Sequence, residues 1–600
     1  IGRGLDNGVR NQFVYAATQG QTAFTGADSD GKTLAMTDIL YTDCYQNGVK
    51  LKPTTDYTVS STTLTLVSGA SLNDVINIVS FDIFAVADTV PASTGGTFVG
   101  QVTFTADTTF ADGADIITAS AGTSNFRAGV NAGNSIQSGG NFNTVVGDEA
   151  GTAITTGDNN TFMGYAAGDV TTTSSHNTGI GHNALGANVL GSYNVAVGKD
   201  SLEEMNPASA VNMYNTAVGA AAGQKVTTGV QNTLIGGKAG DAITTANDNT
   251  GVGYQALTST TTGHSNISMG TNAMNGNTTG NSNTGVGFQA LANNTTASSN
   301  TGLGYNAGVN ITTGANNTAV GKGSLDACTT STNNVAVGND AGGGVTTGNG
   351  ENVFVGNRAG LGVTTGQQNI IIGDNACANG TMTGNLNVFI GDNAGLAATS
   401  GANNTIIGGS AGDALTVGNS NTAVGQNALS LDTQGDLNTA IGIGALQSQN
   451  FTSSTDSYNT AVGGFAGGSN TTGQNNTFVG GLAGNSNTTG DNNTVMGSIA
   501  GDALTEGERN VAIGYNSLSD DTKGARNVAI GDSALGDQNF TSATNSYNTA
   551  VGFFAGGTIS TGTGNTLIGG LAGDAITTGG QNVAIGKEAL GATTTGTSNV

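Results

Sequence analysis

Most of the chain repeats one short pattern of apolar and polar positions. From Asn143 onward, a unit of the form N-T-A-V-G-x-x-A-G-x-x-x-T-T-G-x-x recurs 26 times, and 20 of these units are followed by the next after 17 residues. Every unit has Val, Ile, Leu or Met at position four, Gly at position five, and Ala or Ser at position eight, counted from the opening Asn. A fixed period of this length predicts a solenoid or array, in which each unit forms one coil that stacks on its neighbours.

Within one coil, the alternation predicts a short strand. In the unit that opens at Asn160, Thr161 and Met163 point to one face and Phe162 to the other, and Gly164 ends the strand at a sharp turn. We expect a second short strand after the Ala-Gly pair, with successive coils pairing in parallel about 4.8 Å apart. The repeated Asn predicts a ladder of side-chain amides, each bonded to the Asn below and to the turn backbone.

The apolar content of one coil also bears on assembly. Each coil offers one aliphatic side chain, one Thr or Val and one Ala for burial, while ordering 17 residues costs about 25 kcal/mol at about 1.5 kcal/mol per residue. We therefore expect a single coil to be unable to enclose a core, and several chains to share one. The small residue at position eight would let three chains meet closely around one axis.

Residues 11–88 follow a different pattern. Apolar and polar residues alternate in segments rich in Val, Ile, Tyr, Phe and Thr, such as QFVYAAT, TLTLVSG and DVINIVSFDIF. This indicates a small antiparallel β-sandwich, with a two-residue hairpin at Asn47-Gly48 and a turn at Leu72-Asn73-Asp74. Residues 1–10 are interpreted as the remnant of an upstream segment. Residues 89–124 predict a β-rich neck or shaft, with a flexible linker as the alternative.

The sequence therefore predicts an all-β chain whose larger part is a long parallel β-solenoid, or β-roll, over residues 125–600. It contains 27 coils, and the first is degenerate because Arg127-Ala128 replaces the usual apolar pair. A degenerate first coil suits a cap. Ile1 is not a start residue and Ser598-Asn599-Val600 opens a further unit, so we expect both ends of the chain to be cut.

Composition narrows the classes of protein. The chain has 100 Gly in 600 residues, 9% charged residues and no Trp, which is unlike a multi-domain enzyme. The net charge of −25 would repel phosphate backbones and anionic lipid, so we expect neither nucleic acid nor membrane as a partner. Cys44, Cys328 and Cys377 lie far apart and are interpreted as small buried residues rather than as a disulfide framework.

Three units are four residues longer than the others: Asn194 to Tyr214, Asn438 to Tyr458 and Asn527 to Tyr547. Each insertion ends in Tyr and carries Met or Phe. Insertions in solenoids go to outer loops, which are often the binding face, so these side chains could contact a sugar or a protein surface. Alternatively, they fold back over the edge of the coil. The candidate surface contacts are Met213, Tyr214, Phe451, Tyr458, Phe540 and Tyr547.

No set of residues indicates catalysis. His176, His182 and His264 are the only histidines, and the first two occupy different phases of neighbouring units, so no repeated metal or acid-base set arises. The carboxylate pairs Glu203-Glu204 and Asp520-Asp521 could in principle serve a glycosidase, but no cleft is predicted for them. We expect no enzyme, and assign no catalytic, cofactor-binding or metal-binding residue.

Two stretches resemble known families. The segments NQFVYAATQGQTAFTGADSDGKTL, YQNGVKLKPTTDYTV and LTLVSGASLNDVINIVSF look like the N-terminal module of tail fibres of marine phages, especially those that infect cyanobacteria. The repeat over residues 125–600 resembles the left-handed parallel β-roll heads of trimeric autotransporter adhesins, whose units carry an N-x-A-I-G-x-x-A core in a shorter coil. It is also similar to the NTAVG arrays that precede self-cleaving chaperone domains in phage fibres and tailspikes.

These resemblances imply a structural and adhesive fibre subunit of a phage tail. The chain would be a homotrimer in the virion tail, outside the cell, with its N-terminal module toward the tail proteins and its roll as a rigid spacer. A tip beyond this sequence would bind a host surface glycan or protein. The alternatives are a cell-surface adhesin of the autotransporter type, a tailspike glycan hydrolase, and an ice-binding solenoid. For the last, the stacked Thr-Thr pairs lapse at Leu415-Thr416-Val417 and at Asp520-Asp521-Thr522.

Overall fold

The computed structural model describes residues 8–36, 39–83 and 120–600. The chain divides into two compact units, Ile1–Asp115 and Ile116–Val600. The neck predicted for residues 89–124 falls almost wholly outside the described residues, as does most of the segment 1–10.

The first unit consists of two small antiparallel sheets and one short 3₁₀ helix, η1 (Ile39–Tyr41). In the first sheet the strand order is β1 (Gly8–Ala16), β7 (Val75–Ile83), β3 (Thr42–Gln46) and β4 (Val49–Lys50). In the second sheet the order is β2 (Gln21–Thr25), β6 (Thr63–Ala70) and β5 (Tyr57–Ser60).

Side chains from both sheets share one core, which includes Phe13, Phe24, Leu64 and Ile78. The hairpin between β3 and β4 turns at Asn47-Gly48, where φ is 48° and 84°. Both values are positive, as a two-residue type I′ turn requires, so the predicted hairpin is confirmed.

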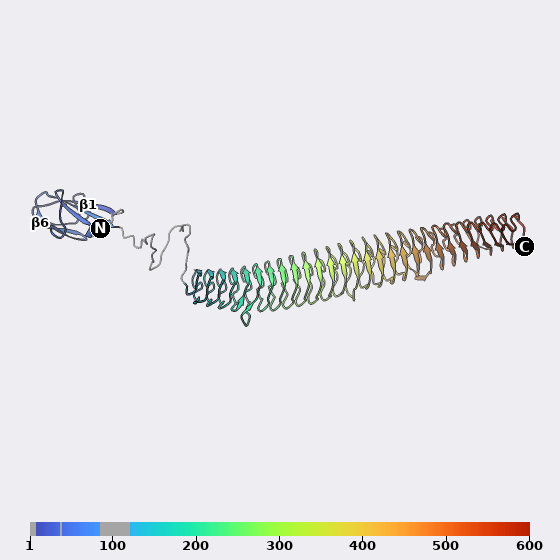
Figure 1. The fold of residues 1–600 in the computed structure, drawn as a ribbon, viewed down its shortest axis with the longest axis horizontal. Helices are drawn as coiled ribbons and strands as arrows, with labels where there is room; N and C mark the ends of the chain where they lie inside the picture. Colours follow the sequence, from blue (N-terminus) through green and yellow to red (C-terminus); the bar gives the residue numbers. More distant parts are fainter. Residues whose placement is uncertain (1–7, 37–38, 84–119) are drawn as a thin grey trace. The chain divides into compact units, whose positions relative to one another are not determined.

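The second unit is a long stack of coils (Figure 1), and each coil contributes one three-residue strand to a parallel ladder of 27 strands. The pairing is in strict register, with Thr161 opposite Thr178 and Phe162 opposite Gly179. The ladder is open, because β8 and β40 lie at the two ends of the stack. The strands of the ladder are β8 (Phe126–Ala128), β9 (Thr144–Val146), β10 (Thr161–Met163), β11 (Thr178–Ile180), β13 (Val195–Val197), β15 (Thr216–Val218), β16 (Thr233–Ile235), β17 (Thr250–Val252), β18 (Ile267–Met269), β19 (Thr284–Val286), β20 (Thr301–Leu303), β21 (Thr318–Val320), β22 (Val335–Val337), β23 (Val353–Val355), β24 (Ile370–Ile372), β25 (Val388–Ile390), β26 (Thr405–Ile407), β27 (Thr422–Val424), β29 (Thr439–Ile441), β31 (Thr460–Val462), β32 (Thr477–Val479), β33 (Thr494–Met496), β34 (Val511–Ile513), β36 (Val528–Ile530), β38 (Thr549–Val551), β39 (Thr566–Ile568) and β40 (Val583–Ile585).

The second strand expected in every coil is wrong for the ordinary coils. Residues at positive φ, such as Ala166 at 51° and Gly168 at 58°, make the chain turn after the strand instead of extending. The far side of the coil is instead tied to the next by single rungs. Thr244, for example, donates both its N–H (3.0 Å) and its hydroxyl (3.2 Å) to the carbonyl oxygen of Thr261.

A second pair of strands forms only where the longer coils stack on their neighbours. The three pairs are parallel and two residues long: β12 (Gly191–Ser192) with β14 (Val211–Asn212), β28 (Gly435–Asp436) with β30 (Thr455–Asp456), and β35 (Gly524–Ala525) with β37 (Thr544–Asn545). The four additional residues therefore give the chain room to extend on the side where ordinary coils bend.

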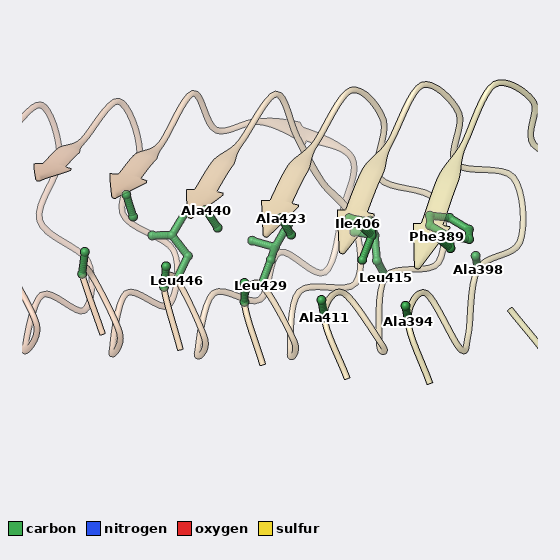
Figure 2. Packing of buried hydrophobic residues seen from close by; sticks show 14 of the residues in the cluster. Phe389, Ala394, Ala398, Ile406, Ala411, Leu415, Ala423, Leu429, Ala440 and Leu446 are labelled. Carbon is green, nitrogen blue, oxygen red and sulfur yellow. The ribbon is translucent and has the colours of Figure 1, made fainter. Parts of the chain in front are cut away.

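The hydrophobic core runs along the inside of the stack and is closed by a single chain. Positions three, eight and twelve of each coil point inward, as Figure 2 shows for Ile406, Ala411 and Leu415. These side chains are at most 2% exposed. Our expectation that several chains must share one core is therefore wrong, because each coil packs on the coils before and after it and the core is continuous along the axis.

The predicted ladder of asparagines is confirmed and lies inside the coils. The backbone N–H of Asn160 donates to Oδ1 of Asn143 at 2.9 Å, and its Nδ2 donates to the same oxygen at 3.1 Å. The same Nδ2 also donates to the carbonyl oxygen of Ser174 in the following turn at 2.9 Å. Buried amides are thus paired both between coils and with the turn backbone, which removes the cost of burying them unpaired.

The Gly at position five is required where the strand meets the corner. Gly321 has a φ of 129°, and a Cβ placed there would clash with the carbonyl oxygen of Gly338, the equivalent residue of the next coil. Both the left-handed backbone and the close approach of the next coil exclude a side chain. The sequence-based interpretation of this Gly is confirmed.

Candidate interaction surfaces

The outward side of the 27-strand ladder is a uniform surface that extends along the second unit. It is formed by positions two and four of each coil and is called the strand face below. From β9 to β40 every residue of the strand face is Thr, Val, Ile, Leu or Met, and none is charged. The side chains are partly exposed, as shown by Met163 (44%), Leu303 (47%) and Val337 (38%), whereas the position between them is buried.

The repeat suggests that its constant aliphatic residue at position four is buried and that the variable position three is exposed, and the structure shows the reverse. Position four, which is always aliphatic, points outward, and position three, which varies from Gly to Phe, fills the core. The variation is accommodated between coils, because the ring of Phe162 occupies the space beside Gly168 and Gly179. The invariant aliphatic residue is therefore not required by the core of this chain.

The insertions place the six candidate contact residues in two groups. Tyr214, Tyr458 and Tyr547 are 52%, 53% and 57% exposed and stand next to the opening Asn of the following coil. The other three fold back and are buried: Met213 (0%), Phe451 (5%) and Phe540 (7%). The tyrosines are therefore accessible for contact with another molecule, and the buried residues hold the insertions against the stack. Figure 1 also shows a small loop standing out from the stack in its cyan-green part, where the first longer coil lies.

The insertions of the second and third longer coils are anchored by buried carboxylates. Asp432 accepts hydrogen bonds from Nε2 of Gln449 (2.7 Å) and from the backbone N–H of Phe451 (3.2 Å). Asp521 accepts the same two bonds from Gln538 (2.6 Å) and Phe540 (3.0 Å). Burial raises the pKa of both carboxyl groups, against the effect of these hydrogen bonds.

Sequence reasoning missed these anchors. Both Asp residues stand at position twelve, where most coils have an aliphatic or small polar residue, and each is followed 17 residues later by Gln at the same position. A charged residue at an inward position is the signal that could have identified them. Asp521 is thus a structural residue, and Glu203 likewise links three coils by accepting bonds from Asn183 and Gln224, each at 2.6 Å.

Two of the three histidines pack against tyrosine rings. His176 stacks on Tyr193 with ring centroids 4.6 Å apart, and His182 stacks on Tyr165 at 5.4 Å. Within the described residues, no three His, Cys, Asp or Glu side chains are placed to hold a metal ion.

The three cysteines are buried free thiols. Burial raises the pKa of Cys44, Cys328 and Cys377 to about 12, so they remain protonated at neutral pH.

Helices able to cross a membrane are absent from the part of the chain that the structure describes. Comparison with protein-family models, with curated proteins and with solved structures finds no match, so the surfaces described above carry the functional argument.

Proposed function

We propose that this chain is the subunit of a homotrimeric fibre, most simply a spacer in a phage tail fibre that holds a host-recognition tip away from the particle. In this proposal the N-terminal module, with its two sheets packed as a sandwich, lies toward the tail proteins, and the solenoid provides rigid length. The chain has no catalytic role and uses no cofactor. The resemblance of the N-terminal segments and of the repeat to fibre and adhesin modules supports this assignment.

The observation that carries the proposal is the composition of the strand face. A chain with a net charge of −25 keeps charge off all 26 strands from β9 to β40 on this side, and retains an aliphatic residue at position four that its own core does not need. Large exposed apolar surfaces of soluble proteins mark sites that another molecule covers. Covering by copies of the same chain explains why the pattern extends along the whole stack.

The area of the strand face and the spacing of its coils also favour a second copy of this chain as the molecule that covers it. At about 4.8 Å per coil, 27 coils extend about 130 Å, and a face two residues wide then offers roughly 850 Å² per chain. Stable two-chain interfaces bury about 800 Å² per partner, so the total area of the strand face is of the right size, although in a trimer each chain divides it between two neighbours. Another copy has the same coil spacing, so its rows of side chains can match the strand face coil by coil, which an unrelated globular surface cannot do.

Charge on the strand face tests the proposal. Replacing Val320, Val337 and Val355 together by Lys puts three like charges into the proposed interface at one height, so the full-length variant should dissociate toward monomer. Sedimentation velocity of the wild type should give one elongated particle of three chains. A wild type that sediments as a monomer at micromolar concentration refutes the homotrimer.

A matched control uses the same coils on a different side. Thr330, Thr347 and Thr365 are exposed at position fourteen of these three coils, and changing them to Lys adds the same charge away from the strand face. This variant should remain trimeric. If both triple variants dissociate alike, net charge rather than the strand face controls assembly.

The alternatives predict different results in the same preparations. A cell-surface adhesin of the autotransporter type would also be trimeric, and it would be distinguished by a gene that continues into a coiled-coil stalk and a membrane barrel. A glycan hydrolase would release reducing ends from host polysaccharide incubated with the purified chain. An ice-binding solenoid would shape growing ice crystals at micromolar concentration.

A further inference from the structure

The second and third longer coils are built on one scaffold that occurs twice, 89 residues apart, as the distance between Asn438 and Asn527 shows. Both copies have the buried Asp anchor, the Gln that bonds it, and a two-residue parallel strand pair beside the insertion. A surface feature found on only one copy is therefore not needed to fold the scaffold.

A groove with a volume of about 360 Å³ lies beside the third longer coil. Six of its eight lining residues are polar, and they supply hydroxyl, carboxylate, ammonium and amide groups. The lining residues are Thr489, Glu506, Glu508, Lys523, Ala525, Ala543, Thr544 and Asn545. They come from positions fourteen to sixteen of three coils and from the insertion, so none of them belongs to the strand face.

The charges around this groove leave one cation without a carboxylate partner. Nζ of Lys523 lies 2.8 Å from Oε1 of Glu506, and Nη1 of Arg509 lies 2.9 Å from Oε1 of Glu508. For Arg526, no carboxylate lies within ion-pair distance among the described residues. Glu506 and Glu508 thus neutralise two of the three basic residues, and Arg526 supplies the one positive charge among them that no carboxylate offsets.

The guanidinium of Arg526 is held in a fixed orientation. Its Nε donates to Oδ1 of Asn545 at 2.8 Å, and Asn545 itself lines the groove. The guanidinium carbon also lies 5.8 Å from the ring centre of Tyr547, whose side chain is more than half exposed. An oriented guanidinium with free terminal nitrogens is well suited to bind a carboxylate through two parallel hydrogen bonds.

The equivalent positions of the second longer coil lack this chemistry. Leu437 takes the place of Arg526, Gln434 that of Lys523, Val417 that of Glu506 and Asn419 that of Glu508, while Asp456 stands where Asn545 accepts the guanidinium. The exposed tyrosine is kept as Tyr458. The second copy thus carries two carboxylates, Asp436 and Asp456, and no basic residue at these positions. The scaffold therefore folds without basic groups there, and the basic residues of the third coil require another explanation.

We propose that the groove of the third longer coil binds a sugar acid, that is, a saccharide ring carrying one carboxylate. The carboxylate would pair with Arg526, the ring hydroxyls would bond to Glu508, Asn545 and Thr544, and the exposed Tyr547 would cover an apolar face of the ring. A groove of this volume is at the size of small-ligand sites and exceeds what one hexose ring needs. The site goes beyond the spacer role and requires neither the trimer nor the virion.

Calorimetric titration of the full-length chain tests this site. The acidic probes are trigalacturonate and 3′-sialyllactose, and their neutral counterparts are the methyl ester of trigalacturonate and lactose. We expect at least one acidic probe to saturate one site per chain and to bind at least tenfold more tightly than its neutral counterpart. The site is refuted if neither acidic probe saturates, or if the neutral counterpart binds equally well.

Three variants identify the residues. Arg526→Leu copies the residue found on the second scaffold, so it should fold normally and lose the acidic preference by about tenfold or more. Tyr547→Ala should weaken binding, and the matched Tyr458→Ala should leave it unchanged. Binding by Arg526→Leu equal to wild type overturns the proposal. Sedimentation of the same samples reports the trimer separately, so failure of the site and failure of the fibre proposal are distinguishable.

Discussion

Removing one rung of the asparagine ladder is the most direct test of what holds the coils together. Asn249 donates from its N–H (3.1 Å) and its Nδ2 (3.2 Å) to Oδ1 of Asn232, and from Nδ2 to the carbonyl oxygen of Gly263 (3.0 Å). Its own Oδ1 accepts from the N–H (3.0 Å) and the Nδ2 (3.1 Å) of Asn266. In Asn249→Ala, the buried N–H of Asn266 and the carbonyl of Gly263 both lose a partner.

The magnitude follows from those two groups. Each buried polar group left unpaired costs about 1–3 kcal/mol, so we expect Asn249→Ala to weaken the stack locally by roughly 2–6 kcal/mol. Asn249→Asp should be at least as damaging at pH 7, because the carboxylate would face the carbonyl oxygen of Gly263 with no proton to donate. It should recover in acid, where a protonated carboxyl can donate that bond again.

A solenoid opens locally, so the assay must be local. Hydrogen exchange measured by mass spectrometry should show loss of protection over the coils on either side of Asn249, including the amide of Asn266, with coils more than two units away unchanged. Asn379→Ala, at an exposed position of another coil, is the control and should have no measurable effect. Unchanged protection of the Asn266 amide in Asn249→Ala would refute the ladder as a source of stability.

Two further predictions concern single residues of the solenoid. Gly321→Val should open the stack at that coil at a cost of several kcal/mol, because Val disfavours a φ of 129° and its Cβ would clash with the carbonyl oxygen of Gly338. Protease resistance equal to that of the wild type would contradict this role of Gly321. Burial raises the pKa of Asp432, so between the ordinary Asp pKa of about 3.9 and the raised value the folded chain binds more protons than the unfolded chain. The stability of the second longer coil should therefore fall as pH rises through that window. Hydrogen exchange of the Phe451 amide, corrected for its intrinsic rate, should show weaker protection at the upper end of the window. Equal protection at both ends would show that the Asp432 carboxyl does not titrate there.

The N-terminal unit illustrates how far local signals extend. Alternating segments identified its strands, and Asn47-Gly48 identified a hairpin because few residues other than Gly and Asn accept positive φ at both turn positions. The pairing of β1 with β7, the first and last strands of this unit along the sequence, joins residues that lie 59 (Ala16 and Val75) to 75 (Gly8 and Ile83) positions apart. Such a pairing has no local signature in the sequence.

In the solenoid, the repeat by itself determined everything that depends on one coil meeting an identical neighbour. The period, the parallel strand that follows each opening Asn, the Gly at the corner and the asparagine ladder all follow because each position stacks on its own equivalent, whereas the second strand expected in each coil was wrong for the ordinary coils. Only the tertiary structure decided which strand face is inside. The alternation of side chains places Phe162 on one face of the strand and Thr161 and Met163 on the other. Which face is buried depends on the direction in which the chain turns after Gly164. That turn uses residues with positive φ, such as Ala166, which no sequence rule had identified. The same physical reason explains the missed anchors, because Asp432 becomes a buried acceptor only after the coil has closed around it.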